Sequence, residues 1–320
     1  MSFNFDRAQS VAKSLSHVAK FRSGTISGRK KPDKQRRATL DQVQLLVATP
    51  GRLLNYHDKG AVFFSDVRYV VVDEADTMLA AADFGVQDLV PRLLSAINST
   101  DKRTPVPAGG SAPASSDGHL ADAQFVFASA VLSPSVSAYV EQTLGGNRFA
   151  SAPAVVRGPA LHRPAGRLTS EWLAVKGGAK MEALIDTVGR LRGDGRRAIV
   201  FCNTANSCRA VEHSLREAGL DAVGYHAGVP PRQRADAYRA FVEEEHSVLV
   251  ATDIAARGLD ISNVSTVVMF DLPSDSVDFL HRVGRTARAA KAGKVVSLVA
   301  PRDRKRAARL KRWVDGGGLK

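Results

Sequence analysis

At residues 69–76 the chain reads Tyr69-Val-Val-Val-Asp-Glu-Ala-Asp76, an apolar run that ends in three carboxylates within four positions. A short run of β-branched residues predicts a strand that is buried on both faces, as in a parallel sheet. In open parallel sheets, ligands bind beyond the carboxyl ends of the strands. Asp73 and Glu74 are therefore candidates for chemistry. The alternative is that these acids only cap a helix that begins near Thr77.

Similar apolar runs recur through the chain and alternate with helical stretches, which is the pattern of parallel strands joined by crossover helices. The predicted strands are 44–49, 69–73, 124–129, 198–202, 222–226, 247–252, 266–270 and 294–299. A length of 320 residues suits two domains of roughly 150 residues each. The sequence therefore predicts an α/β protein in which one fold type is used twice.

Two stretches lack the apolar pattern of the rest. Residues 98–122 are rich in Ser, Pro, Gly and Ala, which predicts a disordered surface insertion without catalytic groups. Three prolines between 150 and 166 fall between the two sets of strands, where a linker belongs. We therefore expect a first domain at 1–155, a linker at 156–166, a second domain at 167–302 and a basic tail at 303–320.

The charge balance indicates an acidic partner. Lys and Arg outnumber Asp and Glu by 45 to 32, which gives a net charge of +13 and suits a phosphate-rich molecule. Much of the excess lies in runs at 29–37 and 302–312, and such runs are by default solvated tails or loops.

Cysteine content and hydropathy bear on the setting of the protein. Cys202 and Cys208 are the only cysteines, too few for a disulfide framework or a four-ligand zinc site, so a reducing, intracellular setting is expected. No signal-peptide core and no run of about 18 apolar residues is present, so we expect a soluble protein without membrane contact.

Seven further short segments form a set of sequence motifs that is informative only when they are taken together. They are Thr49-Pro-Gly-Arg52, Ser129-Ala130, Val200-Phe-Cys-Asn-Thr204, His226 to Arg234, Ala251 to Ile261, Asp271-Leu-Pro273 and His281-Arg-Val-Gly-Arg-Thr-Ala-Arg288. With Asp73 to Asp76, in this order over residues 49–300, the chain resembles the DEAD-box RNA helicases of superfamily 2. The resemblance implies two tandem RecA-like domains with parallel sheets flanked by helices, the first of them incomplete.

The resemblance also implies ATP and Mg²⁺ as cofactors. Asp73 would hold Mg²⁺ through water, and Glu74 would accept a proton from the attacking water. Arg285 and Arg288 of the second lobe would stabilise charge on the γ-phosphoryl group, unless they only pair with carboxylates or solvent. The ribose would be bound at Gly258 and Asp260, although Gly258 also suits a simple turn.

RNA contacts and coupling between the lobes follow from the same resemblance. The coupling residues would be Asp76, Ser129, Ala130 and His281, and His281 is alternatively a packed, hydrogen-bonded histidine. The RNA backbone would be held, without sequence specificity, by Thr49, Gly51, Arg52, Thr204, Arg234 and Thr252. Thr49 and Thr252 are alternatively helix N-caps. The run at 302–312, with Trp313, either extends the RNA path or forms a plain amphipathic end helix.

The chain departs from the family at several positions. No Gly-x4-Gly-Lys-Ser/Thr loop occurs, since the nearest segment, Gly24 to Lys31, has three residues between its glycines. The adenine-reading Q motif and the Arg-Glu-Leu-Ala element of motif Ia are also missing. We therefore expect an N-terminally truncated chain, with a helix at 7–21 that would follow those elements, and these 320 residues alone are expected to be inactive as an ATPase.

Three smaller departures concern single residues. Val131 replaces the Thr of Ser-Ala-Thr and loses a hydroxyl that could couple the lobes. Ala287 and Ala290 stand where the family often has Gly. A methyl group there is expected to be tolerable only if the backbone dihedral φ stays negative.

Two functional hypotheses follow, with a third disfavoured. The first is a monomeric ATP-dependent RNA helicase that remodels RNA or RNA–protein complexes, with ribonucleoprotein or ribosome-assembly particles as partners. The alternative is a catalytically deficient RNA-binding or assembly factor with the same shape. A phosphate-binding loop encoded roughly 30 to 40 residues before Arg7 would favour the first. The motif spellings disfavour a DNA helicase of the same superfamily.

Overall fold

The computed structural model of this chain describes residues 22–26, 43–80, 89–98, 123–131, 154–158, 167–176, 178–193, 196–243, 247–256, 261, 264–287 and 291–316. The chain divides into two compact units, Met1–Gly158 and Pro159–Lys320. The insertion expected at 98–122, apart from Asn98, and the helix expected at 7–21 lie outside the described residues. The predicted domain boundaries and linker stay predictions.

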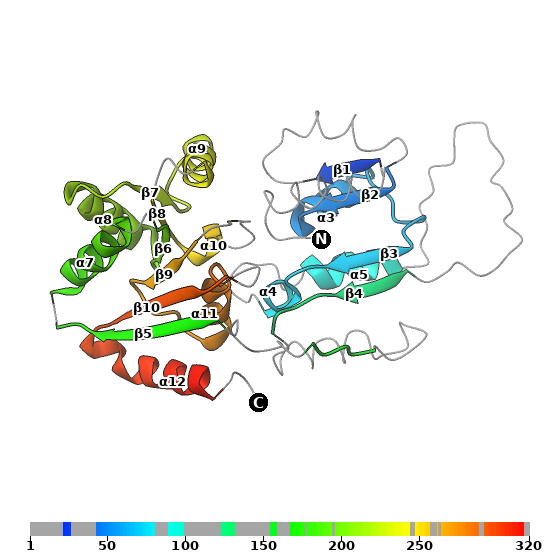
Figure 1. Ribbon diagram of the computed structural model, residues 1–320. Helices are drawn as coiled ribbons and strands as arrows, with labels where there is room; N and C mark the ends of the chain where they lie inside the picture. The colour runs from blue at the N-terminus through cyan, green and yellow to red at the C-terminus, as the bar shows by residue number, and fades with distance from the viewer. Residues whose placement is uncertain are drawn as a thin grey trace, which may run out of the picture. The chain divides into compact units, whose positions relative to one another are not determined.

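Unit 1 contains two pairs of parallel strands (Figure 1). Strand β1 (Ser23–Ile26) pairs with β2 (Leu45–Ala48), and β3 (Tyr69–Val72) pairs with β4 (Gln124–Phe127). The helices are α3 (Pro50–Asp58), α4 (Ala75–Ala80) and α5 (Leu89–Asn98). Helix α3 follows β2 and α4 follows β3, as expected for strands joined by crossover helices.

Helix α5 packs against both strand pairs of unit 1. Leu94 lies in an apolar cluster with Val70 and Val72 of β3 and Met78 of α4. Leu93, the adjacent residue, lies in a second cluster with Ile26, Ala48, Leu53 and Leu54. Neighbouring side chains on a helix point about 100° apart, so one helix can cover two surfaces. The two cores of unit 1 therefore meet at α5.

Unit 2 is built on a six-stranded sheet in which every pairing is parallel, in the order β5-β10-β9-β6-β8-β7. The strands are β5 (Leu168–Ala174), β6 (Ala198–Phe201), β7 (Ala222–Tyr225), β8 (Val248–Ala251), β9 (Thr266–Met269) and β10 (Gly293–Val299). The helices are α7 (Lys180–Gly193), α8 (Ala205–Glu217), α9 (Pro231–Val242), α10 (Asp253–Ala256), α11 (Ser276–Val283) and α12 (Arg304–Asp315).

Helices cover both faces of the unit 2 sheet. Ile199 and Phe201 face a core built with α9, α11 and α12, whereas Val200 faces a core built with α7 and α8. Because side chains alternate along a strand, burial of both faces requires the uninterrupted apolar runs seen in the sequence. The predicted α/β class with parallel sheets flanked by helices is confirmed.

The sequence did not predict β1 and β5. Strand β5 lies at the edge of the sheet and pairs only with β10. Its run, Leu168-Thr-Ser-Glu-Trp-Leu-Ala174, carries polar residues that an edge strand tolerates and an apolar-run search misses. Strand β1 includes Gly24, the first residue of the segment Gly24 to Lys31 that most resembles a phosphate-binding loop. Ile26, the last residue of the strand, is fully buried. That segment is therefore partly a strand.

The basic run at 302–312 is folded. It forms η2 (Pro301–Asp303) and most of α12, whose Ala307 and Leu310 are buried in the core of unit 2. The indole of Trp313 lies edge-on to Phe279, with ring centroids 6.0 Å apart. The run therefore forms an amphipathic helix, and Trp313 packs on the core of its own unit. An extension of the RNA path by its exposed cations stays a prediction.

The backbone at Ala287 contradicts one expectation from the sequence. Its φ is +55°, in the left-handed region that costs a residue with a Cβ atom about 1–2 kcal/mol. The loop is fixed here because the Thr286 hydroxyl donates to Val264 O at 2.7 Å. Gly293 lies so close that an added Cβ would be 2.6 Å from Ala287 N. Ala290 lies outside the described residues.

Replacing Ala287 with Gly is therefore expected to raise the free energy of unfolding of unit 2 by about 1 kcal/mol, because glycine adopts positive φ without steric cost. Urea unfolding followed by tryptophan fluorescence measures this, since both tryptophans lie in unit 2. Ala218, with a φ of −77°, is the matched control. Ala218→Gly should lower stability, and an equal loss in both variants would contradict the strain at Ala287.

Two further observations concern the chain as a whole. None of the helices in the described part of the chain combines the length and the apolar character needed to cross a bilayer. Cys202 and Cys208 are free and buried. A hydrogen bond with Cys208, together with burial, raises the pKa of the Cys202 thiol far above its usual range. This thiol is therefore unreactive at neutral pH.

Candidate functional site

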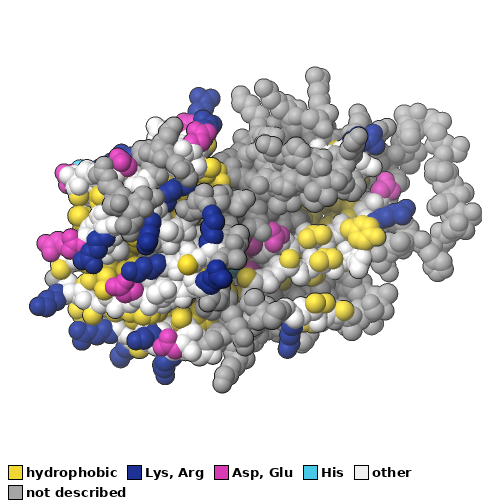
Figure 2. All heavy atoms as spheres, viewed as in Figure 1, with side chains coloured by type: hydrophobic (Ala, Val, Ile, Leu, Met, Phe, Trp, Pro, Cys, Tyr) yellow, Lys and Arg dark blue, Asp and Glu magenta, His cyan; other side chains and the backbone are white. Residues whose placement is uncertain are grey.

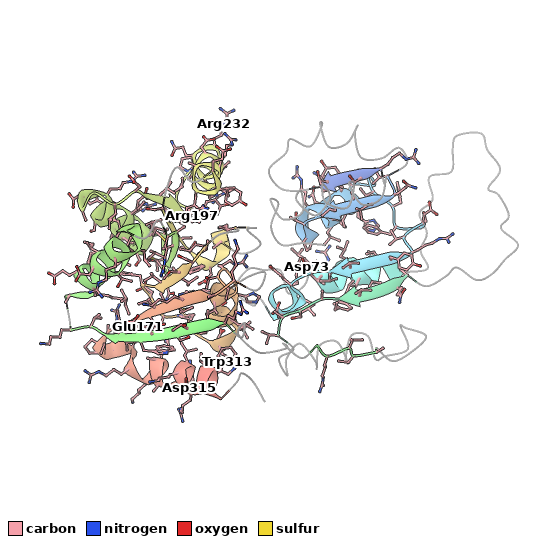
Figure 3. All side chains as sticks on the ribbon, viewed as in Figure 1. Asp73, Glu171, Arg197, Arg232, Trp313 and Asp315 are labelled. Atoms are coloured by element: carbon pink, nitrogen blue, oxygen red, sulfur yellow. The ribbon has the colours of Figure 1, made fainter. Side chains whose placement is uncertain are left out.

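The carboxylates of the opening segment lie at the carboxyl end of β3, where Asp73 follows the strand directly (Figure 3). The ends of β3 and β4 are tied together, because Ala128 N–H donates to Val72 O at 2.9 Å and Ala75 N–H donates to Ala128 O at 3.0 Å. Asp73 and Glu74 are half-buried, and Asp76 is buried in the first turn of α4. The sheet thus presents two partly accessible carboxylates at one point.

Glu74 has a φ of +53°, the left-handed conformation that is uncommon for a residue with a side chain. Its carbonyl accepts from Met78 N–H at 3.0 Å and starts α4, while its own N–H donates to Asp73 Oδ1 at 3.0 Å. The helix begins at Ala75 rather than near Thr77. Such strain is concentrated at functional sites, and here it turns the chain sharply between strand and helix.

The end of β4 forms a tight local turn. Ser129 Oγ donates to Val131 O at 2.6 Å and accepts from Val131 N–H at 3.2 Å. Val131 is 1% exposed, so its apolar side chain fits a buried position where a threonine hydroxyl would need a partner. Ser129 and Ala130 thus lie beside the β3 carboxylates through the β3–β4 pairing.

The end of β2 presents a second set of candidates in unit 1. Thr49 precedes α3 with extended backbone, but its side chain makes no capping hydrogen bond, so the N-cap alternative does not account for its hydroxyl. Arg52 stacks over Tyr56 at 5.4 Å. An added Cβ on Gly51 would lie 3.2 Å from Leu89 Cδ1 of α5, a tight contact that a shift of a few tenths of an ångström in the leucine side chain would relieve.

Three predicted RNA-contacting residues of unit 2 lie along one edge of its sheet. Thr204 follows β6, Thr252 follows β8, and Arg234 lies on α9 after β7, where it donates to His226 O at 3.4 Å. The strands β6, β8 and β7 are adjacent and parallel, so their carboxyl ends share an edge. Thr204 also caps α8 by accepting from Ser207 N–H at 3.0 Å. The side chain of Thr252 is buried.

Positive charge surrounds His226 at this edge. Burial lowers the pKa of His226, and the nearby guanidinium groups of Arg209 and Arg234 lower it further, against the opposing carboxylate of Glu212. The neutral ring accepts from Gly228 N–H through Nδ1 at 3.2 Å. The lowered pKa favours the neutral form of His226, and the two neighbouring guanidinium groups are the side chains at this edge that suit contact with an anionic backbone.

A buried arginine joins four of the sequence segments in unit 2. Arg282 is 1% exposed, and its Nε and Nη2 donate to the two carboxylate oxygens of Asp253 at 2.6 and 2.7 Å. The same guanidinium donates to Asn203 Oδ1 at 2.7 Å and to the backbone oxygen of Asp271 at 2.5 Å. Bidentate pairs of this kind fix geometry as well as charge. Arg282 thus positions the ends of β6, β8 and β9.

Asp271 forms the second half of this network. Lys180 Nζ donates to one oxygen at 2.8 Å, and the other accepts from Asn203 N–H at 3.2 Å and Ser207 Oγ at 2.9 Å. Burial alone would raise the pKa of Asp271, but the hydrogen bond and charge of Lys180, with the two other donors, bring the pKa below its usual value. Asp271 is therefore ionised at neutral pH and fastens the start of α8.

The remaining candidates are only partly placed. His281 is half-buried on α11, and Arg285, which is 5% exposed, donates from Nε to His281 O at 3.3 Å. Arg288, Gly258 and Asp260 lie outside the described residues. Within the described ranges no group of three His, Cys, Asp or Glu side chains forms a metal-binding cluster. The carboxylates of Asp73 and Glu74 are the oxygen donors that suit Mg²⁺ bound through water.

Sequence reasoning missed the roles of Arg282, Asp253, Asn203 and Lys180. The first three stand inside the quoted segments without an assigned task, and Lys180 stands in none of them. One signal was present, because Asn203 and Asp253 each come two residues after a buried strand. Their convergence depends on strand order, which the spacing of the segments does not reveal.

Comparison with known families and proteins supplies independent findings. The model for DEAD/DEAH box helicases matches residues 5–138, and the model for the helicase conserved C-terminal domain matches residues 179–290. DEAD-box ATP-dependent RNA helicase 39 of Arabidopsis thaliana is 37% identical over 303 residues, which cover 94% of this chain and 45% of that protein. The ATP-dependent RNA helicase DbpA of Escherichia coli is 30% identical over 94% of this chain and 59% of its own length.

Solved structures share the fold at lower sequence identity. Dbp5 of S. cerevisiae, bound to RNA and ADP BeF3, superposes with a TM-score of 0.76 at 20% identity and covers 99% of this chain and 74% of that one. Mss116p bound to ssRNA and AMP-PNP gives a TM-score of 0.72 at 20% identity, over 97% of this chain and 60% of that one. The chain spans about half the length of the curated relatives that it matches.

Proposed function

The chain belongs to the DEAD/DEAH box helicase family, and on that premise we propose that the protein is an RNA-dependent ATPase that remodels RNA or RNA–protein complexes. The observation that carries this proposal is the pair of half-buried carboxylates, Asp73 and Glu74, at the carboxyl end of β3 and hydrogen-bonded through the backbone to the end of β4. Acidic side chains at a strand end suit both tasks of nucleotide hydrolysis.

The proposed roles in hydrolysis follow from residue chemistry. Asp73 holds Mg²⁺ through water, and the metal supplies charge neutralisation at the phosphates. Glu74 accepts the proton of the attacking water, and its strained backbone fixes the direction of its side chain. Arg285 and Arg288 stabilise negative charge on the γ-phosphoryl oxygens, and Gly258 with Asp260 binds the ribose.

Coupling and RNA binding are proposed for the strand ends of both units. Asp76, Ser129, Ala130 and His281 couple hydrolysis to conformation. Thr49 and Arg52 in unit 1, with Gly51, and Thr204, Thr252 and Arg234 in unit 2 hold the RNA backbone. The support is that each set lies at the carboxyl edge of its own strands. These residue types contact phosphates and 2′-hydroxyls, so binding is insensitive to base sequence.

We further propose that these 320 residues hydrolyse ATP poorly by themselves. No segment of the sequence has the Gly-x4-Gly-Lys-Ser/Thr spelling, and its backbone amides and lysine are the usual ligands of the β- and γ-phosphates. That such a loop, the Q motif and motif Ia precede residue 1 in a longer protein stays a prediction. The same holds for a monomeric state, an intracellular setting and a ribonucleoprotein partner.

A second candidate function is an RNA-binding assembly factor without ATP turnover. The buried Val131 favours it, because this position lacks the hydroxyl that could link the lobes and its side chain is packed in an apolar environment. Both candidates require RNA binding by the strand-end residues. They differ only in hydrolysis, so the two properties need separate measurements.

The affinity for RNA is expected to fall about 10- to 100-fold in Arg234→Ala, because the variant loses one charge-assisted contact. The fall should be the same for RNAs of different sequence, because the contact is to the backbone. Fluorescence anisotropy with labelled oligo-uridine and oligo-adenosine RNA measures it. Arg239→Ala is the matched control, because Arg239 lies on the same helix, is 66% exposed and faces Asp236. Equal affinities of the two variants would contradict the assignment of Arg234.

ATP turnover is to be measured on two forms of the protein, because both candidates are compatible with no turnover by the 320-residue chain. With RNA present, the 320-residue chain should show no phosphate release above background. A release that Glu74→Gln abolishes would overturn the proposal that the missing loop disables this chain, and would favour the enzyme over the assembly factor. If a loop-bearing longer form of the protein also lacks such activity, the assembly factor is favoured.

A further inference from the structure

Helix α12 presents a basic surface that the family motifs do not include. Ala307 and Leu310 anchor the helix in the core of unit 2, and Trp313 contacts Phe279 (Figure 3). The opposite side of the helix faces solvent. Lys and Arg side chains gather along the lower left of the molecule in Figure 2, where Figure 1 places α12.

The residues of this surface form an ordered array. At about 100° per residue they lie on the side of the helix opposite Leu310. We name the exposed cations Arg304, Lys305, Arg309, Lys311 and Arg312 the α12 basic face. Lys305, Arg309 and Arg312 are four and three residues apart and form a single row about 10 Å long.

Carboxylates do not neutralise the α12 basic face within the described residues. Ion pairs within 4.0 Å in this region join Arg302 and Arg306 to Asp303, outside the face. Arg309 donates to the backbone oxygen of Ser274 at 2.7 Å, and Arg312 donates to that of Ala308 at 3.4 Å. Among the described residues, these two guanidinium groups therefore donate to backbone oxygens and form no ion pair with a carboxylate.

The array opposes the stability of its own helix. Lys305 and Arg309 are like charges at positions i and i+4, which repel each other. Arg304 and Lys305 stand in the first turn, where the helix dipole favours acids, and that turn contains none. A helix whose only role was to cover the core would be more stable with acidic residues in its first turn. A polyanion bound to this face would relieve the repulsion.

The position of α12 in unit 2 indicates which kind of polyanion the α12 basic face would bind. Arg306 and Arg309 donate to the carbonyls of Leu272 and Ser274, in the segment that follows β9. Through Arg309, the face thus reaches the carboxyl end of β9, which is next to β6, the strand that precedes the proposed RNA contact Thr204. The exposed apolar residue beside the face is Ala308, and no exposed aromatic side chain occurs among the described residues of α12, so the helix offers little for a membrane to bury.

We propose that the α12 basic face binds the phosphate backbone of the same RNA strand, or of its continuation, beyond the strand-end residues. This inference rests on the proposed function, because it presumes that RNA lies along the carboxyl edge of unit 2. Contacts of this kind release counterions, so affinity becomes more dependent on salt without becoming sequence-specific.

The test removes three of these charges, in Lys305→Gln/Lys311→Gln/Arg312→Gln. A control variant, Lys176→Gln/Arg190→Gln/Arg239→Gln, removes equal charge from exposed positions on other elements. The affinity for fluorescein-labelled oligo-uridine RNA is measured over a series of KCl concentrations. The magnitude of the slope of log K against log [salt] should fall by about 2 in the α12 variant, because each phosphate contact on a single strand contributes about 0.7. In the control variant it should fall by less than half as much.

Equal slopes in the two variants would overturn the inference while leaving the proposed function intact. A wild-type chain that binds no RNA would overturn both. Poly-glutamate that displaces RNA from the wild type, but not from the α12 variant, at matched charge concentration would assign the face to an acidic protein instead. The melting temperature of the α12 variant should be equal to or above that of the wild type, because repulsion within the helix is removed.

Discussion

Replacing Asp253 with alanine is expected to lower the free energy of unfolding of unit 2 by about 3–5 kcal/mol, because it leaves the guanidinium of Arg282 buried without its carboxylate. Arg282 is 1% exposed, and in this variant its hydrogen-bond partners among the described residues are Asn203 Oδ1 and the Asp271 carbonyl, with the Phe201 ring 5.3 Å from Cζ. Those oxygens do not carry the charge needed to balance a buried cation.

Urea unfolding followed by tryptophan fluorescence measures this loss in unit 2 alone. Asp236→Ala is the matched control, because it breaks an exposed ion pair with Arg239 at 3.6 Å and should cost less than about 1 kcal/mol. The double variant Asp253→Ala/Arg282→Met removes both charges and should be less destabilised than the sum of the two single variants. Losses of the same size at Asp253 and Asp236 would show that the buried pair is not essential.

Replacing Phe279 with alanine is expected to lower the free energy of unfolding of unit 2 by about 3–5 kcal/mol, the usual loss for a fully buried aromatic ring. Phe279 is 0% exposed. Its ring stacks parallel to Trp172 at 5.8 Å and meets the edge of Trp313 at 6.0 Å. The ring therefore joins β5, α11 and α12, and its removal leaves a cavity between three elements.

The midpoint of urea unfolding is the readout, since it does not depend on the altered fluorescence intensity of the two neighbouring tryptophans. Val242→Ala, at a position 41% exposed in the same unit, is the control and should change stability by less than about 0.5 kcal/mol. If Phe279→Ala does not fold, Phe279→Leu retains part of the volume and should still be clearly less stable than the Val242→Ala control. A midpoint equal to that of the control would exclude a core role for this ring.

The predicted central strands of unit 2 are buried on both faces. Strand β3, which the sequence predicted to be buried on both faces, buries only one, because Tyr69 is 72% and Val71 50% exposed. Ile199 and Val200, adjacent in β6, enter different cores, and only an unbroken apolar run satisfies both. Strand β5 escaped prediction because an edge position admits Thr169 and Glu171, which break that run. An apolar run therefore reveals a buried strand even at a sheet edge, as in β7, and misses a strand that carries polar residues, as in β5.

The same distinction applies to the site. Asp73 and Thr204 follow buried strands, so their places at strand ends could be read from the sequence. The contacts of Arg282 could not, because Asn203, Asp253 and Asp271 come together only through the strand order β9-β6-β8. The positive φ of Ala287 was likewise hidden, since it depends on the loop's hydrogen bonds to residues more than 20 positions earlier.

Helix α5 gives unit 1 a mechanical property. Leu93 touches the core beneath β2 and α3, and Leu94 touches the core beneath β3 and α4. Because the two leucines are adjacent on one helix, a rotation of α5 about its axis that changes the packing of Leu93 also changes the packing of Leu94. Helix α5 therefore links the packing of α3, the helix that carries Arg52, to the packing of α4, which follows the β3 carboxylates.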